Sequence, residues 1–281
     1  MAYRTRSTGW QHAKLSGHTN EMLVKELLDN NLKYKNEFMS RLGLRGTTIQ
    51  STSIGGLHET NVPGILGKKT KSKTDLKLIC SNEKNVNISI KKSLSGQVYF
   101  VKASLFINVF EKQFRKPIPS SVQRAIKLFW ADADDALEII HQFGDKTNPK
   151  NYYQQIRHKS LNATTLKNYN INLYNCMLRW FKDNIYELTK LSFAMGAARD
   201  TDEWSDYIWY INLLDEVAVD RLFCIKDLCQ AAVYVADSET YYGSTNGGTT
   251  IQLPFGFVQW HQQQLQFHHS YKKISNLLNP M

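Results

Sequence analysis

The sequence predicts an α/β fold in which helices flank a mixed central sheet, together with a large helical portion and a C-terminal segment that contains strands. Three observations support this fold: an early apolar run at helical spacing, two alternating runs around a short polar turn, and a return of alternating residues near the end. With 281 residues, 42% of them hydrophobic, the chain can bury a sizeable core. We expect three segments, 1–116, 117–236 and 237–281, packed into one globular unit.

The first element is a helix expected over 19–42, because its apolar side chains recur at roughly helical spacing. Thr19 or Asn20 can cap its start. Residues 43–73 are rich in glycine and lysine, which predicts a loop with no more than short strands.

A β-hairpin is expected over 74–91, where two alternating runs flank a polar turn. A turn centred on Glu83 would place Asp75 opposite Lys91. Because side chains alternate along a strand, Asp75, Ser89 and Lys91 would share one face of the hairpin and the apolar side chains the other.

The chain after the hairpin is expected to be mainly helical as far as residue 235. The apolar run 98–114 has helical spacing and is the first of these helices. Further helices are expected over 121–130, 136–143 and 171–191. Strands then follow over 249–261, before a closing helical segment over 272–278.

The charge balance favours a polyanionic partner. The formal net charge is +10, which for a chain of this size favours nucleic acid as the partner over an acidic membrane surface. No stretch approaches the ~20 apolar residues that cross a bilayer, and the start lacks the apolar core of a signal peptide, so we expect a cytoplasmic protein without a membrane partner. The four cysteines form no C-x-x-C pair and are expected to be reduced thiols.

The polar face of the expected hairpin carries the groups needed for phosphodiester hydrolysis. A carboxylate such as Asp75 can hold a divalent metal ion, which acidifies water and stabilises the negative charge that develops on phosphorus. An amine such as Lys91 can orient or deprotonate the nucleophile. Mg²⁺ suits this chemistry because it prefers oxygen ligands and accepts phosphate oxygens among them.

Asp75, followed after a gap by Ser89-Ile-Lys91, resembles the PD-(D/E)xK nucleases, which include most type II restriction endonucleases. Thr74 stands where that family usually has proline, and Ser89 replaces the usual second acid. The resemblance implies a restriction-endonuclease-like mixed sheet, duplex DNA as substrate and Mg²⁺ as cofactor. It also implies catalytic roles for Asp75, Ser89 and Lys91.

Two further residues match the family by their place in the chain. The first helix of such nucleases often contributes a glutamate to the metal site, which suggests Glu21, with Glu26 second, as a metal ligand beside Asp75. Gln97 matches a glutamine that some members place beside the catalytic lysine. The alternatives are a surface salt bridge for either glutamate and a capping role for Gln97.

Two groups of residues are candidate DNA contacts. Four lysines before the hairpin could bind phosphates: Lys68, Lys69, Lys71 and Lys73. Four C-terminal residues could read base edges: Asn246, Gln252, Gln259 and His261. The alternatives are a solvated loop for the lysines and a polar surface for the C-terminal group.

The function expected from these features is sequence-specific, Mg²⁺-dependent cleavage of double-stranded DNA, as in type II restriction enzymes. One alternative is a non-specific or structure-directed phage or repair nuclease with the same fold. Another is a catalytically inactive DNA-binding protein, because Ser89 cannot replace a carboxylate. A homodimer would suit a palindromic target.

Overall fold

The structure is a computed structural model that describes residues 6–55, 61–214, 219–244 and 247–279, with the side chains of the first helix from Ser16 onward. The chain forms two compact units. The first unit consists of Met1–Leu94 and Phe193–Lys226, and the second of Ser95–Ser192 and Asp227–Met281. Each unit is thus assembled from two separate stretches of chain.

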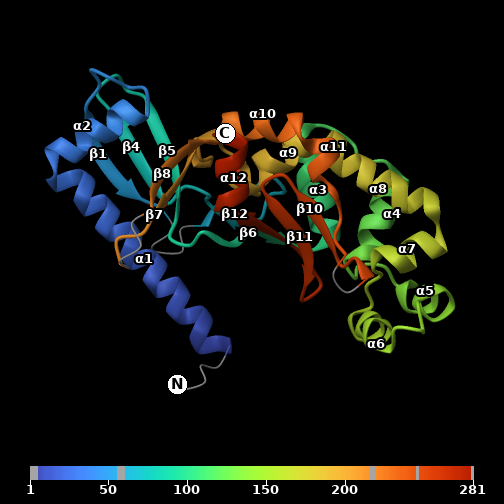
Figure 1. The fold of residues 1–281 in the computed structure, drawn as a ribbon. Helices are drawn as coiled ribbons and strands as arrows, with labels where there is room; N and C mark the ends of the chain where they lie inside the picture. Colours follow the sequence, from blue (N-terminus) through green and yellow to red (C-terminus); the bar gives the residue numbers. More distant parts are fainter. Residues whose placement is uncertain (1–5, 56–60, 215–218, 245–246, 280–281) are drawn as a thin grey trace. The chain divides into compact units, whose positions relative to one another are not determined.

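The first unit contains the mixed central sheet that the sequence predicts, with helices against it (Figure 1). Its strand order is β1-β4-β5-β7-β8, in which β5 and β7 are parallel and the other neighbours antiparallel. The strands are β1 (Ile49–Ile54), β4 (Leu76–Cys80), β5 (Asn85–Lys91), β7 (Tyr207–Ile211) and β8 (Asp220–Cys224). The helices are α1 (Arg6–Asn30) and α2 (Leu32–Arg41), and a small ribbon is formed by β2 (Asn61–Pro63) and β3 (Lys69–Lys71).

The first helical region is longer than predicted and is interrupted. Instead of one helix over 19–42, α1 begins at Arg6 and ends at Asn30, and α2 follows after Asn31. The Asn31 side chain accepts a hydrogen bond from the backbone N–H of Tyr34, which caps α2. The cap signal therefore lies at Asn31, in the middle of the expected helix.

The core of the first unit lies between these helices and the apolar face of the β4–β5 hairpin. Five hairpin side chains are buried there: Leu76, Leu78, Val86, Ile88 and Ile90. They belong to one cluster with Val24 and Leu28 of α1. Phe38 of α2 packs on Trp209 of β7 with ring centroids 4.3 Å apart. This burial fixes which face of the hairpin remains available for polar groups.

The hairpin register differs from the prediction by two residues. Leu76 lies opposite Ile88 and Leu78 opposite Val86. The turn is tighter than a turn centred on Glu83 would be, because Cys80 N–H donates to the carbonyl of Lys84 and Glu83 itself adopts φ 62°. An even shift leaves every side chain on its predicted face, so the apolar grouping is confirmed while the pairing of Asp75 with Lys91 is wrong.

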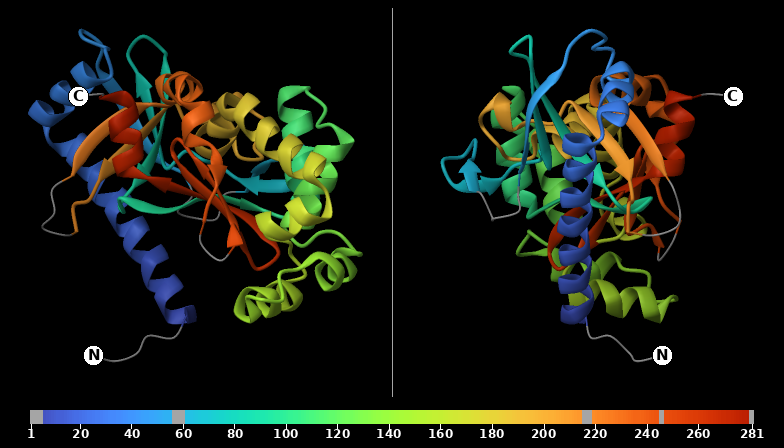
Figure 2. Two further views of the ribbon diagram at one scale, coloured as in Figure 1. Left: turned by 45° about the vertical axis from the view of Figure 1, so that its right-hand side comes forward. Right: turned by 90° about the vertical axis from the view of Figure 1, so that its left-hand side faces the viewer.

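The second unit is built around an antiparallel sheet of order β6-β12-β11-β10-β9, accompanied by helices (Figure 2). The strands are β6 (Ser95–Val101), β9 (Tyr241–Tyr242), β10 (Thr250–Leu253), β11 (Gly256–His261) and β12 (Gln264–Ser270). The helices are α3 (Ala103–Phe114), α4 (Ser120–Phe129), α5 (Ala136–Phe143), α6 (Pro149–His158), α7 (Ala163–Tyr169), α8 (Ile171–Asp183), α9 (Ile185–Lys190), α10 (Ile225–Tyr234), α11 (Ala236–Glu239) and α12 (Tyr271–Leu278).

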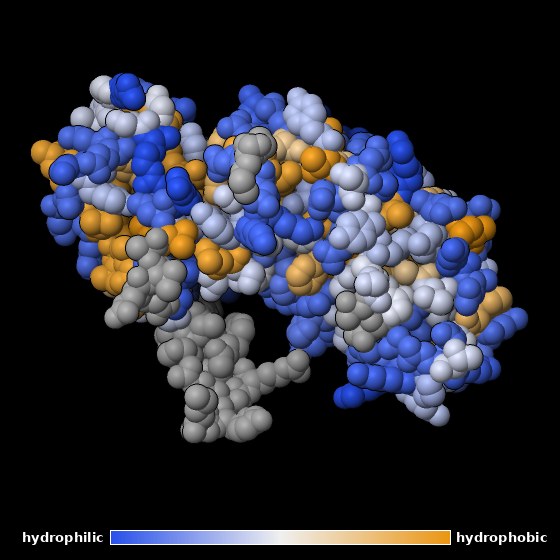
Figure 3. Space-filling view, in the orientation of Figure 1, coloured by the Kyte–Doolittle hydropathy of each residue, from blue (hydrophilic) through white to orange (hydrophobic). Residues whose placement is uncertain are grey.

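Aromatic packing joins the helices of this unit to its sheet. Phe106 of α3 lies 5.9 Å from Phe267 of β12, and Phe110 of α3 lies 4.9 Å from Trp180 of α8, measured between ring centroids. All four side chains are buried or nearly so. On the outer side, hydrophilic residues gather over α5 and α6 (Figure 3).

One prediction for the middle of the chain is wrong, and a second is confirmed except at two strands. The run 98–114 is not one helix, because its first part belongs to β6, which pairs with β12, and α3 begins only at Ala103. The stretch expected to be mainly helical up to residue 235 is mainly helical, but it also contains β7 and β8, which complete the first sheet. The strands predicted over 249–261 and the closing helix correspond to β10, β11 and α12, whereas β12 lies beyond the predicted strands.

The two units also differ from the three consecutive segments expected over 1–116, 117–236 and 237–281. Their composition follows from strand pairing, because β7 and β8 join the first sheet while β6 joins the second. All four cysteines are free thiols. Within the described ranges, no helix is both long and apolar enough to cross a membrane.

Asn20 supplies a test of this fold, because it is fully buried within α1 instead of capping it. Its Nδ2 donates to the carbonyl of Ile211 at 2.9 Å, and its Oδ1 accepts from Leu213 N–H at 2.8 Å. Asn20→Ala should lower the free energy of unfolding by about 2–3 kcal/mol, since two buried backbone groups lose their partner. Urea denaturation measures the free energy of unfolding. Met22→Ala is the control, because Met22 lies on the same helix and is 48% exposed. Equal losses in both variants would contradict the role of Asn20.

Candidate active site

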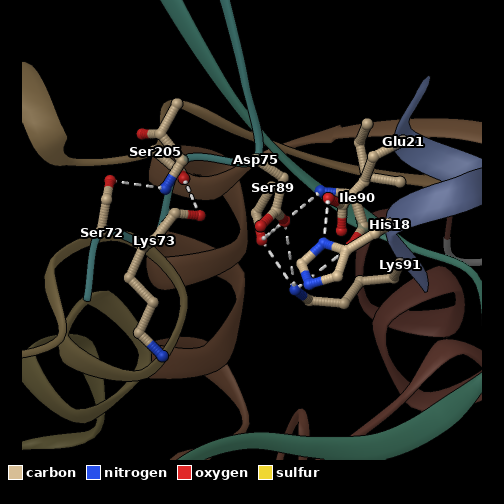
Figure 4. A network of polar contacts seen from close by, with 10 residues as sticks. His18, Glu21, Ser72, Lys73, Asp75, Ser89, Ile90, Lys91 and Ser205 are labelled. Carbon is tan, nitrogen blue, oxygen red and sulfur yellow. Dashed lines mark hydrogen bonds and ion pairs between the residues drawn. The ribbon is translucent and has the colours of Figure 1, made fainter. Parts of the chain in front are cut away.

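Asp75, Ser89 and Lys91 form a continuous chain of polar contacts on the polar face of the hairpin (Figure 4). Lys91 Nζ donates to Ser89 Oγ at 2.7 Å, and Ser89 Oγ donates to Asp75 Oδ2 at 3.1 Å. The same carboxylate oxygen accepts from the backbone N–H of Ile90 at 2.7 Å and lies 3.9 Å from Lys91 Nζ. The sequence thus placed the three side chains correctly together, although in a different register.

The register explains how the contacts arise. Asp75 N–H donates to the carbonyl of Ile88, which brings Asp75 beside Ser89 on the neighbouring strand. Lys91 lies two residues further along β5 on the same face and reaches back to the serine. Only 2% of Ser89 is exposed, so its hydroxyl is an internal link between acid and amine and not a solvated surface group.

Glu21 and His18 come from α1 and lie beside this chain (Figure 4). Glu21 Oε2 is 3.2 Å from His18 Nδ1, and 13% of the Glu21 side chain is exposed. Burial and the negative charge of Asp75 raise the pKa of Glu21 from 4.5 to about 7, against the opposing effect of His18. Glu21 therefore lies near enough to Asp75 for the two carboxyl groups to interact electrostatically, and its role as a metal ligand stays a prediction.

Lys73 brings a second amine close to the site. Burial, assisted by the positive charge of Lys91, lowers its pKa to about 7, while Asp75 acts in the opposite direction. Its aliphatic stem packs on Gly196, where an added Cβ would lie 2.9 Å from Lys73 Cε. The sequence predicted Lys73 as an exposed phosphate contact, whereas its side chain is partly buried in the first unit.

The donor set of this site is suited to a hard divalent cation. Asp75, Glu21 and Ser89 supply oxygen atoms, and burial together with the negative charge of Asp75 raises the pKa of Glu21 even though His18 and Lys91 act in the opposite direction. Mg²⁺ is commonly held by one or two carboxylates with water and substrate phosphates. In the described part of the chain, no three His, Cys, Asp or Glu side chains gather as they would for a fully protein-coordinated metal ion. The residues therefore fit Mg²⁺ that shares its coordination with substrate.

Gln97 does not occupy the predicted place at the foot of a helix. It lies in β6 of the second unit, opposite His268 of β12. Its Oε1 accepts a hydrogen bond from Gln266 Nε2 at 2.5 Å. The side chain is thus part of a cross-strand polar contact, which arises because the run after Gly96 is a strand and not a helix.

The remaining lysines of the predicted phosphate-binding group are exposed. Lys68 precedes β3, while Lys69 and Lys71 lie in it. These three lysines belong to the first unit, and their exposed side chains could contact a polyanion. Glu26, the second candidate glutamate, is exposed on α1.

The C-terminal candidates lie on strands of the second unit. Gln252 is in β10, and Gln259 and His261 are in β11. Gln259 Nε2 donates to Gln266 Oε1 at 3.0 Å and lies 3.2 Å from His268 Nε2. Asn246 lies outside the described residues.

Sequence reasoning missed His18 and the local role of Lys73. His18 stands three residues before Glu21 on a helix, a spacing that brings side chains into contact, and this was the available signal. Lys73 had no comparable signal, because its burial depends on Gly196, which is distant in sequence.

Comparison with known proteins finds similarity at the level of structure and not of sequence. No family model matches the chain, and no curated protein matches it. Among solved structures, the chain is similar to the restriction endonuclease MspI, crystallised in complex with its cognate DNA. The sequence identity is 10%, the match covers 88% of this chain and 83% of that chain, and the TM-score is 0.45.

The raised pKa of Glu21 predicts a pH-dependent stability. Between pH 4.5 and about 7 the folded protein retains a proton on Glu21 that the unfolded chain releases, so the free energy of unfolding should fall as pH rises through this window. Glu21→Gln removes that penalty. In buffer with EDTA, the free energy of unfolding of Glu21→Gln, measured relative to that of the wild type, should increase by on the order of 2 kcal/mol when the pH is raised from 5 to 8.

Urea denaturation at both pH values measures this difference. Added Mg²⁺ should stabilise the wild type at pH 8 more than it stabilises Glu21→Gln, because the variant lacks one carboxylate ligand. A stability difference that is the same at pH 5 and pH 8 would show that Glu21 is not held near Asp75 in a buried site.

Proposed function

We propose that this protein is a Mg²⁺-dependent endonuclease that hydrolyses phosphodiester bonds in double-stranded DNA. The observation that carries the proposal is the contact chain from Lys91 Nζ through Ser89 Oγ to Asp75 Oδ2, with Glu21 electrostatically coupled to the same carboxylate. Acids that hold a cation beside a fixed amine are the equipment for attack of water on a phosphodiester.

Lys91 has the most direct part in the proposed reaction. Water attacks phosphorus and the bond to the 3′ oxygen breaks, which leaves a 5′-phosphate and a 3′-hydroxyl. The Lys91 ammonium can orient the attacking water and stabilise the charge that develops on the phosphate oxygens. Ser89 limits the positions of this amine, because Nζ lies 2.7 Å from a buried hydroxyl that is itself tied to Asp75.

Asp75 and Glu21 would hold Mg²⁺ in this proposal. The bound cation lowers the pKa of water and offsets charge on the phosphate. Asp75 keeps its orientation through the Ile90 N–H and the Ser89 hydroxyl, which both contact Oδ2. The carboxylate is therefore positioned before substrate arrives.

Charge and exposed polar residues support DNA as the substrate. The net charge is +10, and Lys68, Lys69 and Lys71 are exposed beside β3 in the unit that holds the site. We further propose sequence-specific cleavage, as in type II restriction enzymes of restriction-modification systems, with Gln252, Gln259 and His261 among the base-reading candidates. A homodimer would present two such sites to a palindromic sequence, and the cytoplasm is the compartment where this activity would act.

A specific observation favours a second candidate, a DNA-binding protein without catalytic activity. Ser89 occupies the position of the usual second acid, and its hydroxyl is committed to Asp75 and Lys91. The site then has fewer charged ligands for a metal ion. Turnover of DNA distinguishes the two candidates, and a defined set of fragments distinguishes specific cleavage from non-specific or structure-directed cleavage.

The first test is cleavage of plasmid and phage DNA with Mg²⁺, with EDTA as the metal-free control. Asp75→Asn should reduce the rate by at least about 10²–10³-fold, because a charged ligand is replaced by a neutral one. Gel analysis of products over time gives the rate. Wild-type rates for Asp75→Asn would exclude this site, and absence of Mg²⁺-dependent cleavage by the wild type would favour the second candidate.

A second test separates the roles of Lys91 and Ser89. Lys91→Ala should reduce the cleavage rate by about 10²–10³-fold while DNA affinity changes by less than about tenfold, since the amine acts mainly in the transition state. Ser89→Ala should cost only about tenfold, because the amine remains but loses its anchor. Single-turnover cleavage and fluorescence anisotropy measure the two quantities.

Ser89→Asp provides the matched comparison, because it restores a charged oxygen ligand at the same position. It should lower the Mg²⁺ concentration needed for half-maximal cleavage. Identical metal dependence in wild type, Ser89→Ala and Ser89→Asp would contradict the position of Ser89 in the metal site.

A further inference from the structure

The second unit contains a small polar pocket at α6 and β11. Six of its lining residues matter here: Asn151, Gln154, His158, Thr249, Gln259 and Trp260. Its volume is about 130 Å³. Sites for drug-sized ligands usually measure ~300–1,000 Å³, so this pocket is suited to a single planar ring system.

A stacked pair of rings forms one wall of the pocket. His158 of α6 lies parallel to Trp260 of β11, with ring centroids 3.9 Å apart and an interplanar angle of 12°. The indole Nε1 of Trp260 is buried without a hydrogen-bond partner among the described residues, a condition that bound water or a ligand normally relieves. Flat aromatic walls of this kind bind nucleobases by stacking, whatever the sequence.

The pocket also presents hydrogen-bonding groups that the fold does not use. Gln154 and Asn151 make no side-chain hydrogen bond to any described residue, and Gln259 uses its Nε2 but leaves Oε1 as an acceptor. By contrast, Gln155 in the same wall is structural, since its Oε1 accepts from the backbone of Asn162. The unused amides are therefore available to a ligand.

These groups have the chemistry that recognises a nucleobase. Asn and Gln amides offer a donor and an acceptor side by side and pair bidentately with adenine. The pocket is lined by no acidic side chain, which suits a ligand attached to a phosphodiester backbone. A base inside a duplex cannot enter a concave pocket, whereas a base that has left the stack can.

We propose that this pocket binds one unstacked nucleobase of the DNA, with adenine preferred. The inference rests on the proposed function in that DNA is the ligand, but it concerns binding in the second unit and not the cleavage step. Because His158 and Trp260 are stacked on each other, the base would stack on an outer face of this pair. Gln154, Asn151 and Gln259 provide the groups that contact the edge of the base.

The test compares two fluorescein-labelled single strands of equal length in buffer with EDTA, one wholly abasic and one with a single central adenine. Fluorescence anisotropy with the full chain should show that the adenine strand binds about tenfold more tightly. Trp260→Ala should remove this difference and leave the affinity for the abasic strand unchanged. Trp260→Phe keeps an aromatic surface and should retain most of the preference.

Tyr153→Ala is the matched control, because Tyr153 is an aromatic residue of the same helix that is 67% exposed and does not line the pocket. It should keep the wild-type preference. Gln154→Leu should reduce the preference for adenine over thymine at the central position while the affinity for thymine stays the same, since a similar volume remains but the amide is lost.

Equal affinity of the wild type for the adenine and abasic strands would overturn the proposal. The proposal would also be overturned if free adenosine bound in a Trp260-dependent manner while the adenine and abasic strands bound equally, because the pocket would then be a site for a small nucleoside. The outcome is separable from the proposed function. If Asp75→Asn loses cleavage but the wild type shows no preference for adenine, only the pocket proposal is refuted. Adenine preference in a protein that never cleaves DNA refutes only the nuclease.

Discussion

The pairing of β4 with β5 is the constraint on which the rest of the first unit depends. Burial of Leu76, Leu78 and Ile88 against the helices fixes one face of the hairpin, and alternation along the strands then leaves Asp75 and Ser89 on the other. Val24 and Leu28 hold α1 in this core, and Glu21 of the same helix lies close enough to Asp75 for that carboxylate to contribute to its raised pKa. Hydrophobic packing thus determines the electrostatics of the site.

The site concentrates charged groups where solvent is limited. A buried hydroxyl separates an amine from a carboxylate, and the second carboxyl group, that of Glu21, has a raised pKa because it is buried and because Asp75 is negatively charged. Such an arrangement stores unfavourable electrostatic energy in the absence of a cation. Binding of a positive ion together with a phosphate would relieve it, which couples ligand binding to the stability of the first unit.

The sequence predicted the parts of the fold that local patterns determine. Alternating residues revealed the hairpin and assigned its faces, and helical spacing revealed the region of α1 and α2. It could not reveal β7, whose residues are buried on both sides of the sheet and show no alternation, nor β6, whose strand character depends on pairing with distant β12. For the site, Glu21 followed from chain order, while the burial of Lys73 depends on Gly196 and required the fold.

The parallel pairing of β5 with β7 has a consequence for the newly made chain. On the ribosome β5 emerges long before β7, since residues 92–206 lie between them and translation adds about 5–20 residues per second. For that interval the strand Asn85–Lys91, which carries Val86, Ile88 and Ile90, has an open edge able to pair with other extended chains. We therefore expect the nascent protein to be vulnerable to aggregation and to gain from chaperones until its first unit closes around β7.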